Sequence, residues 1–242
     1  MSRQDVHNSD TPVICRSCEV RHRGLCGALD ARQLLALSRH THVVRRPAGE
    51  ELIADASEVR TYANVMRGMV KLSKTLEDGR QQVVGLQFAP DFLGRIHSAQ
   101  SKVAAQAASD VDLCTIPKAA LEKLMAENPA LERRLFEQTL RELDEARDWM
   151  VTLGRKTAGE KVASFLHRVA LHIDPLAGTS GKGTGIRFDL PLSRADIADF
   201  LGLTIETVSR QLTRLRKDGV IEVEHNRAFF IPDLDRLEAR CG

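Results

Sequence analysis

Two short amphipathic segments separated by a glycine, near the C-terminus, constrain the fold of this chain more than any other feature. Ser193 is a good helix N-cap, Asp196 follows where the helix dipole favours an acid, and Gly202 can end the helix. Thr204 can begin a second helix, whose apolar residues we expect to form one buried stripe. These residues are Ile205, Val208, Leu212 and Leu215. The order of helix, tight turn and helix is typical of a helix-turn-helix unit.

The residues after the second helix predict a β-hairpin. The runs Val220–Val223 and Ala228–Ile231 are rich in β-formers and flank a polar turn. A hairpin at this place would be the wing of a winged helix. The alternative is a pair of core helices that a glycine simply joins, and the hairpin and cap residues together argue against it.

The exposed face of the second helix is suited to a DNA major groove. Arg210 can form a bidentate contact with guanine, Glu206 can accept from cytosine N4, and Ser209 can contact a base or a phosphate. We predict a DNA-binding set of Glu206, Thr207, Ser209, Arg210 and Arg214, with Arg216 and Lys217 adding positive charge for phosphates. The net charge of the chain is only +2, so this prediction depends on local charge placement.

The region from about residue 41 to residue 116 predicts a series of short strands broken by turn residues. The runs Val65–Leu72 and Gln82–Phe88 are expected to be neighbouring strands around the turn Glu77–Gly79. A small antiparallel barrel or roll fits this pattern best.

A long helix is expected from about residue 118 to residue 153, where helix-forming residues dominate and no glycine occurs. Its second part carries a narrow apolar seam at alternating three- and four-residue steps, as in a two-stranded coiled coil. The seam residues are Phe136, Thr139, Leu143, Ala146, Met150 and Leu153. We therefore predict a dimerisation helix; the alternative is that the seam packs on the β domain of the same chain.

A further helix is expected over 158–172, followed by a glycine-rich stretch over 176–185. This stretch lacks the spacing of a phosphate-binding P-loop and precedes a strand-like run, so we interpret it as a flexible connection.

Three cysteines form a C-x2-C-x7-C group at Cys15, Cys18 and Cys26, and Cys114 lies in a predicted strand much further along the chain. Four thiolates fit either a [4Fe–4S] cluster or a tetrahedral zinc ion, and the spacing does not choose between them. The alternative for Cys114 is a small buried apolar residue. Cys241 has no cysteine near it in sequence and is expected to be a free surface thiol.

No apolar run approaches the roughly 18 to 20 residues that a membrane span needs, and residues 1–12 lack the apolar core of a signal peptide. We expect a cytoplasmic protein that does not contact membranes. Its cysteines would be kept reduced there, which favours metal binding over disulfides.

The segment from Leu192 to Arg210, LSRADIADFLGLTIETVSR, resembles the helix-turn-helix signature of the CRP/FNR family of transcription regulators. The resemblance covers nearly the whole chain, because this family combines an N-terminal β-roll, a long dimerisation helix and a C-terminal winged helix. It implies a homodimer that binds palindromic promoter sites with half-sites resembling TTGAT, and RNA polymerase as a partner. It assigns base reading to Glu206, Ser209 and Arg210.

The cysteine arrangement is similar to that of the FNR-type oxygen regulators within this family. This resemblance implies one [4Fe–4S] cluster per subunit, held by Cys15, Cys18, Cys26 and Cys114. In such proteins the cluster forms without oxygen and favours the DNA-binding dimer, while oxygen converts it to a [2Fe–2S] form and weakens the dimer. Ala146 on the seam favours pairing, and we hypothesise that it makes dimerisation less dependent on the cluster.

Other functions are weighed against this one. Cyclic-nucleotide regulators with this fold carry a Gly-Glu and an Arg-Ser pattern that 91–103 lacks, so we expect no cyclic nucleotide to bind. A redox enzyme is disfavoured, because the chain has no dinucleotide fingerprint and no catalytic constellation. A cluster-free or zinc-stabilised regulator, and one that responds to nitric oxide or haem ligands, stay open.

The predicted fold is α+β, with four parts. They are a cysteine-rich cluster-binding segment over 1–30, a β-roll sensor domain over 31–122, a dimerisation helix over 123–154, and a winged helix-turn-helix domain over 155–242.

Overall fold

The computed structural model describes residues 12–16, 18, 20–173, 185–225 and 227–242. The chain divides into two compact units, and each is described by itself. The first unit comprises the described residues of Met1–Leu76 and Val84–Leu143, and the second comprises Glu77–Val83 and the described residues of Asp144–Gly242. The boundary falls within the long helix α4 (Pro129–Arg155).

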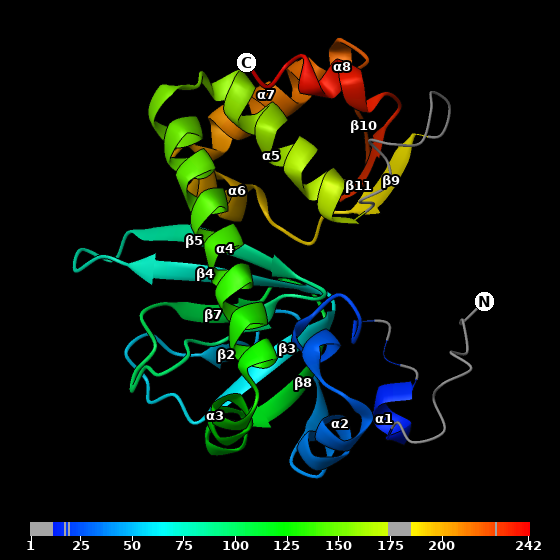
Figure 1. Cartoon of the computed structure of the whole chain (residues 1–242). Coiled ribbons are helices and arrows are strands. Elements are labelled where there is room, and N and C mark those ends of the chain that lie inside the picture. The colour runs from blue at the N-terminus through cyan, green and yellow to red at the C-terminus, as the bar shows by residue number, and fades with distance from the viewer. Residues whose placement is uncertain (1–11, 17, 19, 174–184, 226) are drawn as a thin grey trace. The chain divides into compact units, whose positions relative to one another are not determined.

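Two four-stranded sheets form a β-roll in the first unit, as the sequence predicts (Figure 1). One sheet has the order β1-β8-β3-β6 and the other has the order β2-β7-β4-β5. The strands are β1 His42–Arg46, β2 Glu51–Ile53, β3 Thr61–Arg67, β4 Met69–Thr75, β5 Gln81–Phe88, β6 Phe92–Leu93, β7 Ala104–Ala107 and β8 Val111–Pro117. Apolar residues from both sheets, such as Val65, Val70 and Val111, are fully buried in one cluster.

The run Val65–Leu72, expected to be one strand, is divided at Gly68 between β3 of one sheet and β4 of the other. Gly68 has a φ of 88°, and a Cβ atom there would collide with the carbonyl oxygen of Asp110. Only glycine makes this corner without strain, which is why the chain changes sheets at this residue.

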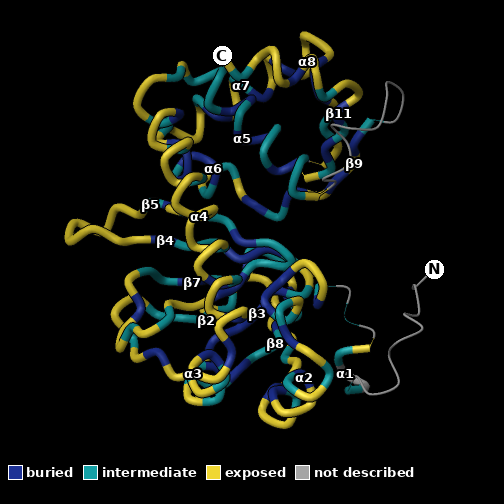
Figure 2. Tube along the Cα trace, in the orientation of Figure 1, coloured by how far each residue is buried: buried dark blue, intermediate teal, exposed yellow. Residues whose placement is uncertain are grey.

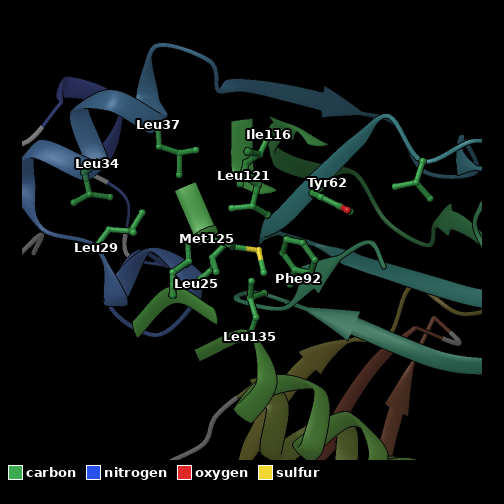
Figure 3. Packing of buried hydrophobic residues seen from close by; sticks show 12 residues of the cluster. Leu25, Leu29, Leu34, Leu37, Tyr62, Phe92, Ile116, Leu121, Met125 and Leu135 are labelled. Carbon is green, nitrogen blue, oxygen red and sulfur yellow. The ribbon is translucent and has the colours of Figure 1, made fainter. Parts of the chain in front are cut away.

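Helices pack the N-terminal segment against the β-roll. A 3-10 helix η1 (Leu25–Ala28) and the helix α2 (Ala31–Ser38) pack with α3 (Lys118–Glu127) and the first turns of α4. Figure 3 shows their shared core, in which Leu25, Tyr62 and Leu121 are almost fully buried. Each such side chain contributes about 1.5 to 3 kcal/mol by burial. The core therefore fixes Cys26, which packs against it, beside the sheet.

The single helix expected over 118–153 is two helices, because the chain breaks at Asn128. Asn128 is extended, with a φ of −137° and a ψ of 92°. Pro129 disfavours the helical conformation for the residue before it, and its fixed φ suits the first turn of a new helix. The Asn128 Oδ1 accepts from the N–H groups of Ala130 and Leu131, which caps α4.

The second unit contains the predicted winged helix-turn-helix (Figure 1). Its elements are α5 Ala158–Ile173, β9 Ile186–Asp189, α6 Arg194–Leu201, α7 Ile205–Lys217, β10 Glu222–Glu224, β11 Ala228–Ile231 and α8 Leu234–Glu238. The wing strands β10 and β11 pair, and β9 extends them to a three-stranded sheet. Trp149 of α4 makes an edge contact with Phe200 of α6, with ring centroids 4.6 Å apart.

The caps predicted for the two helices are present. Ser193 and Asp196 form a capping box on α6, Gly202 ends it with a left-handed φ of 61°, and Thr204 caps α7. Val208, Leu212 and Leu215 are buried, as predicted. The prediction that Ile205 is buried is wrong, because its side chain is 48% exposed in the first turn of α7. The glycine-rich connection predicted over 176–185 lies outside the described residues except for Gly185.

Among the described residues, no helix combines the length and the apolar character that crossing a membrane requires.

Candidate cluster site and DNA-binding surface

Four cysteines from separate parts of the first unit line one pocket. Cys15 lies in the short helix α1 (Val13–Arg16), Cys18 follows α1, Cys26 lies in η1, and Cys114 lies in β8. The structure thus brings together all of the cysteines that were predicted to be ligands. Their segments are fixed by different means, since η1 is held by the helical core and β8 is paired on both sides by β1 and β3.

The thiols lie close enough to influence one another's ionisation. Burial raises the pKa of Cys26 to about 12, and the neighbouring Cys114, Cys15 and Cys18 add to the rise. Burial also raises the pKa of Cys114 to about 11, again with contributions from Cys18 and Cys15. Thiols in such a site need a positively charged centre to become thiolates, and metal binding there would release protons.

Two polar residues in the pocket were missed by the sequence reasoning. Arg21 is buried at 8% exposure and is the one cationic side chain among the described residues that line the pocket. Its charge lowers the pKa of Cys15 and of Cys26, in each case less than burial raises it. Asn64 of β3 is buried beside Cys26. The remaining lining is largely apolar and includes Val20, Leu25, Val43 and Met66.

The arrangement of these thiols bears on which metal centre they fit. No three His, Cys, Asp or Glu side chains in the described part of the chain are grouped closely enough to hold one metal ion. A tetrahedral zinc ion with Zn–S bonds of about 2.3 Å holds its sulfurs only about 3.8 Å apart. A four-iron cluster also takes four thiolates but places several irons between them, so its ligands are spread more widely. The four thiols that line this pocket are the number of ligands that either centre takes.

The helix α7 presents most of the predicted DNA-binding set to solvent. Glu206, Ser209, Arg210 and Arg214 are exposed, and Thr207 is half-buried. The opposite stripe of the helix is buried against its own unit, where α7 packs on α5 and α6. The exposed face is therefore available to an external partner.

Hydrogen bonds arrange the first turn of α7. The N–H of Thr207 donates to the Thr204 hydroxyl at 3.2 Å, and Arg210 Nη2 lies 3.5 Å from the Thr207 hydroxyl oxygen. Bonds to its own backbone N–H and to the Thr204 side chain lower the pKa of Glu206. Thr207 therefore supports the cap and Arg210, while Glu206 is held ionised at the helix start. Arg214 lies further along the helix and lines a hollow that also contains Glu160 and Asp218.

The predicted dimerisation seam is largely exposed on α4 (Figure 2). Phe136 is 61% exposed and Met150 is 72% exposed, while Leu153 is half-buried. Thr139, Leu143 and Ala146 are also exposed, and so are Leu140 and Val151, which the seam prediction omitted. The seam residues of the first unit, Phe136, Thr139 and Leu143, are therefore not buried against the β-roll of that unit. An apolar stripe of this kind on a 27-residue helix marks a surface for association.

Cys241 is a free thiol, as the sequence predicts, but it does not lie fully at the surface. It is half-buried, and its Sγ donates to the carbonyl oxygen of Leu237 at 3.4 Å. Burial raises its pKa.

A winged helix with a polar, capped second helix, together with a β-roll, defines a DNA-binding transcription regulator. Residues 160–240 match the family model described as a Crp-like helix-turn-helix domain, and residues 43–128 match the one described as a cyclic nucleotide-binding domain. The chain belongs to the CRP/FNR family.

Several known proteins are similar to this chain over most of their length. A protein of Rhizobium leguminosarum bv. viciae named "Probable transcriptional activator" is 53% identical, with 98% of this chain and 97% of that protein covered. The transcriptional activator protein FnrL of Cereibacter sphaeroides is 40% identical, with coverages of 94% and 92%. The solved structure of FixK2 from Bradyrhizobium japonicum is 30% identical, has a TM-score of 0.74, and is matched over 84% of this chain and 98% of its own. This chain is thus a transcriptional activator of the family and not an enzyme.

Proposed function

We propose that this protein is an oxygen-responsive activator that binds palindromic DNA as a homodimer when each subunit holds a [4Fe–4S] cluster. The ligands would be Cys15, Cys18, Cys26 and Cys114. One observation carries the proposal, namely that these four thiols, from distant parts of the first unit's sequence, line a single pocket. When bound, such a cluster supplies oxygen-sensitive iron at the place where the N-terminal segment meets the β-roll.

The residues around the pocket suit this role. The largely apolar lining limits the contact of the thiolates with water, and Arg21 places a cation beside a site that gathers negative charge. Neither feature depends on the family resemblance, so both support the proposal independently.

A path of contacts leads from the pocket to the seam on α4. Leu25, next to Cys26, belongs to the same buried cluster as Leu131 and Leu135. Arg134 Nη2 donates to the carbonyl oxygen of Arg23 at 2.8 Å. The exposed Phe136 follows Leu135 directly, so a change in how Cys26 is held can alter the start of the seam. A modest bias of this kind suffices to shift a weak dimer equilibrium.

The family resemblance implies the DNA target, and the exposed face of α7 supports it. Two copies of the helix in a dimer would enter successive major grooves of a palindrome with TTGAT-type half-sites. Glu206, Ser209 and Arg210 would contact bases. An activator also needs RNA polymerase as a partner. No cyclic nucleotide is expected as the signal, because 91–103 lacks the residues that would bind one.

The test measures iron, acid-labile sulfide and the absorption spectrum of protein purified without oxygen. Binding to a labelled TTGAT palindrome is then followed before and after exposure to air. We expect four irons and four sulfides per chain, with bleaching and release of DNA in air. Cys114→Ser should abolish the cluster, whereas the control Cys241→Ser, which alters a cysteine outside the pocket, should retain it.

Each other outcome has a definite meaning. Bound zinc, or no metal, with DNA binding that air does not change would overturn the oxygen sensor and leave a family regulator. Bleaching of the cluster by nitric oxide, with no response to air, would show that the protein responds to nitric oxide and not to oxygen. Loss of the cluster in Cys241→Ser but not in Cys114→Ser would overturn the ligand assignment.

A further inference from the structure

Asn64 contacts the cluster pocket from its β-sheet wall. It lies in β3, directly opposite Cys114 of β8 in the antiparallel register, so the two side chains share one face of the sheet. Its Nδ2 lies 4.0 Å from the Sγ of Cys26, at the long end for a hydrogen bond to sulfur. Asn64 therefore stands between two of the proposed ligands, which come from distant parts of the chain.

The burial of this side chain has a cost that packing alone does not explain. Asn64 is 4% exposed, and in the described structure its Oδ1 has no hydrogen-bond partner. A buried amide with an unsatisfied oxygen destabilises a fold, and an apolar residue of similar size would avoid the penalty. Apart from Cys114, the other lining residues of this wall are Val43 and Met66, which are apolar.

We propose that Asn64 is a positioning residue for the cluster, and that its amide N–H donates to the Cys26 thiolate and sets how readily the cluster is oxidised. This inference rests on the proposed function. An amide has two N–H groups, so it can donate to a ligand sulfur and still reach a second acceptor in the pocket. Such donors withdraw electron density from the sulfur, and hydrogen bonds to sulfurs are among the main determinants of cluster potential.

The direction of the effect follows from this chemistry. A donor to sulfur stabilises the more reduced, more negative state, so its removal should lower the reduction potential and speed oxidative loss. Replacing the amide by a carboxylate should have a larger effect, because it removes the donor and adds negative charge beside the thiolates.

The experiment compares Asn64→Leu and Asn64→Asp with the wild type and with Gln87→Leu. Gln87 is a matched control, because it is also a buried amide of this β-roll whose Oε1 lacks a partner in the described structure. Its Nε2 instead donates to the carbonyl oxygen of Phe92, and it does not line the pocket. The readouts are the cluster's reduction potential in an anaerobic titration, the rate of absorbance loss in air-saturated buffer, and the unfolding midpoint of each protein without iron.

We expect absorbance loss about tenfold faster in Asn64→Leu, because the loss of a partner of a metal ligand changes metal affinity or activity by about 10- to 100-fold. It should be faster still in Asn64→Asp, and both reduction potentials should fall below that of the wild type. Gln87→Leu should match the wild type in both measurements. The unfolding midpoints of the iron-free proteins should not rank the Asn64 variants and the wild type in the order of their rates of absorbance loss. If Asn64→Leu does not fold, Asn64→Asp, which keeps the shape of the side chain, carries the test.

Two failures are distinguishable. A wild-type protein without iron and sulfide overturns the proposed function and this inference together. A wild type that holds the cluster, with Asn64 variants unchanged in potential and bleaching rate, overturns the role of Asn64 alone and leaves the oxygen sensor standing. An equal change in Gln87→Leu would also overturn it, because any buried amide would then have the same effect.

Discussion

At the scale of single residues, Arg210 is placed to separate specific from nonspecific DNA binding. Its guanidinium is exposed and lies near the Thr207 hydroxyl at the start of α7. We expect Arg210→Leu to weaken binding to the TTGAT palindrome by about 1 to 3 kcal/mol and to spare binding to scrambled DNA. Titrations of both DNAs at one salt concentration measure this difference.

The control is Arg216→Leu, an exposed cation in the last turn of the same helix. Its loss should weaken both DNAs alike and reduce the slope of affinity against salt by about one. If Arg210→Leu weakens scrambled DNA as much as the palindrome, Arg210 contacts phosphate and not a base.

His167 of α5 makes the stability of the second unit depend on pH. Burial lowers its pKa, Arg168 and Lys156 act in the same direction, and Glu238 opposes them. The folded unit then binds fewer protons than the unfolded one. The contribution of neutral His167 to the free energy of unfolding is therefore fully present above the ordinary histidine pKa of about 6.5 and is lost as the pH falls. We expect His167→Gln to flatten the decrease of the unfolding midpoint between about pH 7 and pH 5.

The fluorescence of Trp149, the single tryptophan, follows unfolding of this unit specifically. His225→Asn is the control, because His225 is exposed and asparagine tolerates its positive φ of 49°. An equally flattened profile in the control would show that the effect does not come from the burial of His167.

At the scale of elements, the exposed stripe of α4 should hold two copies of the chain together. Leu143 lies in the middle of the predicted seam, and a charge there would be buried without a partner in a dimer. We expect Leu143→Glu to raise the dimer dissociation constant at least tenfold, as measured by sedimentation of the cluster-loaded protein. Arg141→Glu, which places the same side chain at an exposed position outside the seam, should change it much less. Equal sedimentation of Leu143→Glu and the wild type would place the interface elsewhere.

The sequence predicted some helices and strands of this protein accurately and missed others. Caps, apolar period and turn residues act locally, so α5, α6, the start of α7 and β11 were predicted almost to the residue. The first wing strand was expected over Val220–Val223 and lies at Glu222–Glu224. The break at Asn128 was missed although its signal, Asn followed by Pro, is local. The helix α2 was also missed, although its capping box of Asp30 and Gln33 is a local signal in the sequence.

The pocket shows where sequence reasoning stops. Cysteines are chemically distinctive, so their grouping could be proposed from spacing and resemblance. Asn64 and Arg21 are ordinary polar residues whose importance depends on the register of β3 against β8 and on the burial of the N-terminal segment. Neither is encoded in a short pattern, and no spacing rule relates Asn64 to Cys26.

At the scale of the whole molecule, the proposed activity requires two chains to engage one DNA together. Two α7 helices held by a dimer reach half-sites only at the separation that the dimer fixes, about one helical turn or about 34 Å. We expect five base pairs inserted between the half-sites to reduce the affinity to that of a single half-site, because they rotate one half-site by about half a turn. Electrophoretic titrations of the two palindromes and of a single half-site measure this. Equal affinity for the original and the lengthened palindrome would show that the two helices bind independently, and would rule out a rigid dimer as the DNA-binding form.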